Sequence, residues 1–158
     1  MQNINLLLYL IFAAAPLSTM IHELGHAAAA RLLRVDDVSL SIGSGKEIGS
    51  LEAAGIRINI HVCYFLGGVV QSVGNNTLKG REKVLISLAG PLASAFSAFL
   101  AFLAMTGSNE YLHLFALFNL WLAAVNILPF KFRGKETDGY IIWTTIAKHR
   151  ALSKFRHK

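Results

Sequence analysis

Residues 4–33 read INLLLYLIFAAAPLSTMIHELGHAAAARLL, an apolar run that contains one acidic residue, Glu23, and one basic residue, Arg31. A membrane-spanning helix needs about 20 predominantly apolar residues, so this run is long enough to cross a bilayer. Pro16 is expected to kink the helix, because proline removes one backbone donor. Residues 13–15 resemble a signal-peptide cleavage site, but no basic residue precedes the run, so we expect a retained helix.

Two further apolar runs, residues 84–105 and 111–130, contain no Asp, Glu, Lys or Arg. The whole chain of 158 residues is 54% hydrophobic and 15% charged, whereas soluble domains average about 25% charged residues. The sequence therefore predicts a single-domain, all-α membrane protein with three transmembrane helices. The apolar piece 140–147 is too short to span, and we expect it to form a short re-entrant or interfacial C-terminal helix.

The 15 basic residues are distributed unevenly between the connections. None precedes the first run or lies in residues 106–110, whereas seven lie between Arg31, near the end of the first run, and the start of the second, and eight follow the third. Because basic loops stay in the cytoplasm, we expect a multi-pass protein of the cell membrane with its N-terminus outside and its C-terminus cytoplasmic. The tail 148–158 is expected to bind lipid head groups, and the net charge of +6 then requires no nucleic acid.

Segment 35–75 has the alternation of β-strands rather than a helical period. Apolar residues alternate with polar ones over residues 38–42 and 56–62, and glycines surround both stretches. Period-2 alternation predicts short, half-buried strands. We therefore expect a cytosolic loop that contains a β-hairpin.

The first apolar run contains His22-Glu23-Leu24-Gly25-His26. This H-E-x-x-H pattern puts two imidazoles one helical turn apart, as two ligands of one zinc ion require, with the glutamate as general base. An acidic residue near a helix centre costs about 2.5–3.5 kcal/mol on insertion scales, which favours a function for Glu23. The alternative is that both histidines bond to neighbouring helices near the cytosolic boundary.

A catalytic zinc ion usually has three protein ligands, so a third must come from elsewhere. Asp138 follows the third run and begins the last apolar piece. It is either the third ligand or the N-cap of that piece, and spacing alone leaves both open.

Several motifs, in this order, resemble those of the site-2 protease family of intramembrane zinc metalloproteases, in a minimal bacterial form. They are His22–His26, Phe65-Leu66-Gly67-Gly68-Val69, Ala89-Gly90-Pro91, Asn126-Ile127-Leu128-Pro129 and Asp138-Gly139-Tyr140. The resemblance implies one Zn²⁺ per chain, held by His22, His26 and Asp138, with Glu23 as catalytic base. It further implies that Asn126 lies near the substrate backbone or oxyanion. Segment 130–137 departs from the shorter, proline-rich link of many relatives, which leaves the depth of Asp138 open.

The resulting hypothesis is an intramembrane zinc metalloprotease that hydrolyses a membrane-embedded or membrane-associated substrate near the cytosolic side. Strands 38–42 and 56–62 are expected to offer edges to an extended substrate. One alternative is a catalytically idle family member that regulates a partner's processing or export. A prenyl-protein endopeptidase would share the zinc motif but lacks the Gly-Pro and Asp-Gly pairing. A homo-oligomer is also considered, because three helices are few to enclose a zinc site.

Overall fold

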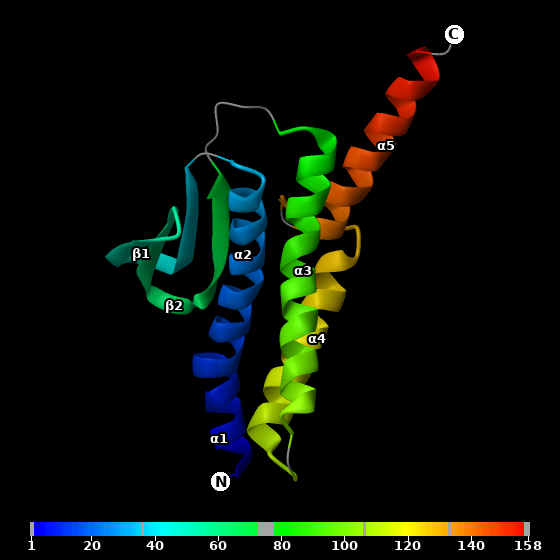
Figure 1. Ribbon diagram of the computed structural model, residues 1–158. Helices are drawn as coiled ribbons and strands as arrows, with labels where there is room; N and C mark the ends of the chain where they lie inside the picture. The colour runs from blue at the N-terminus through cyan, green and yellow to red at the C-terminus, as the bar shows by residue number, and fades with distance from the viewer. Residues whose placement is uncertain (1, 36, 73–77, 106, 133, 157–158) are drawn as a thin grey trace.

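The computed structural model describes residues 2–35, 37–72, 78–105, 107–132 and 134–156 (Figure 1). Within these ranges, three helical segments are long and apolar enough to cross a membrane, as predicted: Asn3–Leu32, Gly80–Leu103 and Glu110–Ile127. The first comprises α1 (Gln2–Tyr9), a π-helical turn η1 (Leu10–Ala14) and α2 (Ala15–Leu32), and the others are α3 and α4. The three pack side by side, and the N-terminus and the α3–α4 connection lie at the same end (Figure 1).

The turn before Pro16 departs from α-helical hydrogen bonding. The N–H of Ala15 bonds to the carbonyl of Leu10, five residues back, which is the π-helical pattern. Proline offers no N–H to the carbonyl of Phe12, four residues before it. That carbonyl accepts a hydrogen bond of 3.4 Å from the Tyr64 hydroxyl. Pro16 therefore leaves the Phe12 carbonyl available to accept a hydrogen bond from the segment that contains Tyr64.

Helix α2 ends in a Schellman motif built on an arginine. Arg34 has a φ of 59°, its N–H bonds to the Arg31 carbonyl, and the Val35 N–H bonds to the Ala30 carbonyl. This pattern satisfies the last carbonyls of the helix, and an apolar contact normally accompanies it. Val35 and Ala30 both belong to the buried cluster beneath the sheet, so the motif turns the chain back onto the helix.

Strands β1 (Val38–Ala53) and β2 (Ile56–Ser72) are both bent, and each pairs with the other twice. Residues 49–53 and 56–60 form an antiparallel hairpin, closed by Ala54 and Gly55 at positive φ as a type I′ turn requires. Residues 38–42 pair in parallel with 56–60 and antiparallel with 68–72. The prediction that 38–42 and 56–62 offer free edges is therefore wrong over 38–42 and 56–60, where each stretch has a strand on both sides.

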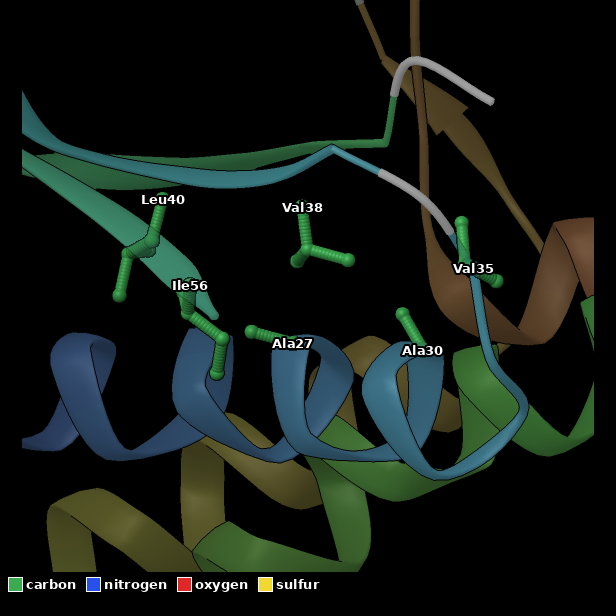
Figure 2. Close-up of a cluster of buried hydrophobic side chains, with 6 residues drawn as sticks. All are labelled: Ala27, Ala30, Val35, Val38, Leu40 and Ile56. Atoms are coloured by element: carbon green, nitrogen blue, oxygen red, sulfur yellow. The ribbon is translucent and has the colours of Figure 1, made fainter. Parts of the chain in front are cut away.

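The sheet packs along α2. Ala27 and Ala30 of the helix face Val38, Leu40 and Ile56 of the strands (Figure 2). Further along β2, the ring of Phe65 contacts that of Phe12 edge to face, with centroids 5.4 Å apart. The sheet thus lies beside α2 and not beyond its end. The reason is that the apolar residues on one face of the sheet need a helix face to cover them.

The C-terminal part differs from the sequence-based prediction in two ways. Helix α4 ends at Ile127, not near residue 130, because the residue before a proline avoids helical angles and Leu128 is extended at φ −71° and ψ 132°. A small hairpin of β3 (Lys131–Phe132) and β4 (Lys135–Glu136) follows. Helix α5 (Asp138–Arg156) then runs for 19 residues, so the piece 140–147 and most of the basic tail form one helix. His157 and Lys158 lie outside the described residues.

Candidate metal centre

His22 and His26 lie one turn apart on the face of α2 that meets α3, and they are only 4% and 8% exposed. Two glycines allow this close approach. A Cβ at Gly25 would lie 2.6 Å from the Ala89 carbonyl oxygen, and a Cβ at Gly90 would collide with both imidazoles. Small residues let helix backbones approach closely in membrane proteins. The glycine of the H-E-x-x-H motif and the glycine of the Gly-Pro pair therefore serve the same contact.

Asp138, the first residue of α5, completes a compact set of three donors. Its Oδ2 lies 3.2 Å from His22 Nε2, its Oδ1 lies 3.3 Å from His26 Nε2, and the two Nε2 atoms are 3.2 Å apart. A tetrahedral ion with bonds of about 2.0 Å has ligand–ligand separations of about 3.3 Å. The two imidazole nitrogens thus lie at the separation that ligands of one zinc ion have, and each has a carboxylate oxygen of Asp138 at a similar distance.

The second ring nitrogen of each histidine also has a partner. His26 Nδ1 lies 2.7 Å from the Ile86 carbonyl oxygen, and His22 Nδ1 lies 3.0 Å from Ser94 Oγ. A carbonyl can only accept, so His26 carries its proton on Nδ1 and its Nε2 presents a lone pair toward Asp138. Such partners orient metal-binding histidines and fix their tautomer. Ser94 was not predicted as part of the site, because a serine in an apolar helix is equally compatible with close packing.

The carboxyl group of Asp138 is ionised at neutral pH. Burial raises the pKa of this carboxyl group, but hydrogen bonds from the protonated imidazoles of His22 and His26 outweigh burial and lower its pKa below the ordinary value when no metal ion is bound. A bound metal ion would take the place of those protons. A carboxylate is the form that binds a metal ion, so this charge state suits the site.

The N-cap of α5 is Thr137, which removes the alternative role considered for Asp138. Thr137 Oγ1 accepts a hydrogen bond from the Tyr140 N–H at 3.3 Å and donates to the Leu128 carbonyl at 2.6 Å. Threonine is a favoured N-cap residue, so the sequence carried this signal. The hydroxyl closes segment 128–137 and leaves the Asp138 side chain directed at the histidines. Gly139 permits the contact, since a Cβ there would collide with the Ile127 backbone.

The three donors open onto a cavity of about 270 Å³. Glu23 and Asn126, the two other site residues expected from the sequence, both line it. The Asn126 amide donates to the Leu122 carbonyl of its own helix at 2.9 Å. The cavity thus brings together residues from α2, α4 and α5 that the sequence separates by more than a hundred positions.

Other polar residues of the helices and the sheet lie away from this site. Asn119 donates to Ser18 Oγ at 2.7 Å, an interhelical hydrogen bond. His61 Nδ1 lies 3.3 Å from the Ile42 carbonyl within the sheet. Glu110 and His113 border a separate cavity between α1 and α4. Within the described ranges, His22, His26 and Asp138 are the one group of three metal-binding side chains close enough to share an ion.

Comparison with known proteins decides the family. The model of peptidase family M50 matches residues 10–110, which is more than half of the chain. The protein belongs to peptidase family M50. This is the site-2 protease family, so the resemblance drawn from the motifs is confirmed. Proteins of the family are membrane proteins, in keeping with the three apolar helices of this M50 chain.

A relative supports the same assignment. The chain is 31% identical over 102 residues to a "putative zinc metalloprotease" of Thermotoga maritima, an alignment that covers 55% of this chain and 20% of the relative. The chain therefore spans about a fifth of the length of that protein. Family and relative together point to zinc as the metal of the M50 site. The family match ends at residue 110, so Asp138 and Asn126 are placed by the structure rather than by this comparison.

Proposed function

We propose that this M50 protein is a zinc-dependent endopeptidase that cleaves a membrane-embedded or membrane-associated peptide. The observation that carries the proposal is the meeting of His22, His26 and Asp138: the two Nε2 atoms are 3.2 Å apart, and each lies 3.2–3.3 Å from one oxygen of the Asp138 carboxylate. Two imidazoles and one carboxylate are a donor set of catalytic zinc sites, and three donors hold one ion per chain. A bound Zn²⁺ lowers the pKa of its water and polarises the scissile carbonyl.

Glu23 and Asn126 supply the chemistry around these three residues. Glu23 follows His22 directly, so it points about 100° away around α2 and borders the cavity beside the donors. From there the carboxylate accepts a proton from the attacking water and returns it to the leaving amine. Asn126 borders the same cavity from α4, where its amide holds the substrate backbone or the developing oxyanion.

The substrate must reach the site as an extended chain, because a helix hides its peptide bonds in intrahelical hydrogen bonds. With residues 38–42 and 56–60 paired on both sides, strands 49–53 and 68–72 form the outer positions of the sheet. No second strand pairs with either of them within the described residues. These outer strands are where main-chain pairing with a substrate would occur.

The orientation proposed for the protein is N-terminus outside and C-terminus cytoplasmic. The basic residues Lys79, Arg81 and Lys83 precede or begin α3 at the end of the bundle toward which α5 runs, opposite the N-terminus (Figure 1). Basic ends face the cytoplasm. Asp138 begins α5, which runs from there toward this end, so cleavage is proposed near the cytosolic side (Figure 1).

The test is the Glu23→Gln variant, compared with wild type for bound zinc and for its effect on the membrane proteome of the producing cells. We expect stoichiometric zinc in both proteins and cleavage slowed by about 10²–10⁴-fold in the variant, so that uncleaved substrates accumulate. Wild-type rates of processing by purified Glu23→Gln protein would falsify the role of Glu23. A wild-type protein without bound zinc, unchanged by His22→Ala, would instead indicate an idle regulatory member of the family.

A further inference from the structure

A second cavity lies between α3 and α5, away from the metal centre. It has a volume of about 420 Å³ and is lined by Gly80, Arg81, Val84, Leu85, Thr145, Ile146, His149 and Arg150. Gly80 allows the two helices to meet here, since a Cβ at this position would lie 3.3 Å from Thr145 Cγ2. The cavity shares no lining residue with the site around His22, His26 and Asp138.

The lining combines two arginines with three apolar side chains. On α3, Arg81 precedes Val84 and Leu85 by one turn, and on α5, Ile146 precedes Arg150 by one turn. Because α3 and α5 run in opposite directions, each arginine lies toward the same end of the bundle relative to the apolar residues of its own helix (Figure 1). No acidic side chain lines this groove.

Two of the apolar side chains of the groove are exposed on the surface of the protein. Leu85 is 53% exposed and Ile146 is 40% exposed. Helix α3 is a candidate membrane span that begins at Gly80, so its first turns lie where head groups meet acyl chains. A ligand for this groove therefore needs an anionic part for the arginines and an aliphatic part for the wall below them.

We propose that this groove binds one anionic phospholipid. Its phosphate lies against Arg81 and Arg150, with His149 beside it, and an acyl chain covers Val84, Leu85 and Ile146. Arginine is suited to phosphate because its planar group donates several hydrogen bonds. A free phosphate ion would leave the apolar wall uncovered, and a lipid with a neutral head group would not match the two cations. The lipid joins α5 to α3 beyond the metal centre that α5 completes.

The experiment titrates the purified protein in detergent with dioleoylphosphatidylglycerol and counts bound lipid by native mass spectrometry. The double variant Arg81→Gln/Arg150→Gln is compared with Lys46→Gln/Lys83→Gln, which removes the same charge outside the groove and outside the basic tail. We expect the arginine variant to bind the lipid at least about tenfold more weakly, since each basic residue near a lipid head group contributes about tenfold or less. The lysine variant should stay within about twofold of wild type.

Two further measurements separate the groove from general charge attraction. Leu85→Ser/Ile146→Ser should weaken binding of the lipid, and dioleoylphosphatidylcholine should bind wild type at least about tenfold more weakly than phosphatidylglycerol. Equal losses in the arginine and lysine variants, equal binding of both lipids, or displacement of the lipid by inorganic phosphate would each overturn the proposal. The zinc content and the melting temperature of every variant are measured alongside, so that a misfolded preparation is recognised and replaced by the single variants Arg81→Gln and Arg150→Gln.

Discussion

Two groups of buried polar side chains lie on the inner face of the first long helix, one turn apart, and they differ in what surrounds their polar atoms. In the first, Ser18 and Asn119 are neutral and hydrogen-bonded to each other at 2.7 Å. In the second, His22 and His26 direct their Nε2 atoms at the carboxylate of Asp138. A donor meets an acceptor in the first group, whereas in the second the lone pair of His26 Nε2 faces a carboxylate oxygen.

This difference separates a packing contact from a site for a cation. The Asn119–Ser18 hydrogen bond holds α4 against α2 without any further group, although Asn119 Oδ1 has no partner among the described residues. With the His26 proton held on Nδ1 by the Ile86 carbonyl, His26 Nε2 and the Asp138 carboxylate are both acceptors, and they repel each other unless a proton or a metal ion sits between them. A buried polar residue in a helix bundle therefore indicates a cation-binding site when both it and its neighbours are hydrogen-bond acceptors.

Substitution of Asp138 is the most direct test of the difference between the two groups. We expect Asp138→Ala to abolish stoichiometric zinc and all cleavage, because removing a ligand costs more than the roughly 10–100-fold seen when a ligand's supporting partner is removed. Metal analysis of the purified protein measures this. The control is Glu52→Ala, which removes an exposed carboxylate from β1. Full zinc content in Asp138→Ala would mean that the third ligand is another residue.

Gly90→Ala tests whether the imidazoles need the space beside α3. The added methyl group collides with His22 and His26, and such overpacking typically costs about 1–3 kcal/mol. We expect zinc affinity to fall by roughly 5–150-fold, measured by competition with a chelator. Gly49→Ala is the control, since its Cβ meets nothing within 4 Å. Unchanged affinity in Gly90→Ala would show that the helices can separate without loss.

Ser94→Ala tests the orientation of His22. Without the hydroxyl, His22 Nδ1 loses the partner that orients the ring, so zinc affinity should fall by about 10–100-fold. Ser94→Thr keeps a hydroxyl and should restore part of the affinity. Ser97→Ala, one turn further along α3, is the matched control. Equal zinc affinity in all three variants would remove Ser94 from the site.

Asn119→Ala should have the smallest effect and act on stability alone. Interhelical hydrogen bonds in membrane proteins contribute about 0.6 kcal/mol on average, so we expect a small decrease in the free energy of unfolding. Zinc content should be unchanged, because neither Asn119 nor Ser18 borders the metal-site cavity. A loss of zinc in this variant would contradict the distinction between the two groups.

Two of the three metal-binding residues could be predicted because they lie close together in the sequence. The i, i+4 spacing of His22 and His26 fixes both rings on one face of a helix wherever that helix packs. Asp138 was found only through the family's Asp-Gly motif, since spacing left its role open. Ser94 and Thr137 were missed, because a serine or threonine is equally compatible with packing, capping and metal-site support.

The strand order shows the same limit. Alternation identified segments 38–42 and 56–62, but it could not show that 38–42 lies between 56–60 and 68–72. A period of two reveals which residues share a face and says nothing about which strand lies beside them. The length of α5 was likewise underestimated, because its charged second half has no apolar run to mark it.

The sequence by itself determined the class of the molecule: three apolar runs, basic residues confined to two connections, and a zinc motif within the first run. These properties depend on the solvent preference of side chains and on the helical repeat, both of which act over a few turns. Only the tertiary structure decided that Asp138, 116 residues after His22, joins the two histidines. That meeting depends on how closely α2, α3 and α5 pack, and the absence of a side chain at Gly25, Gly90 and Gly139 allows it.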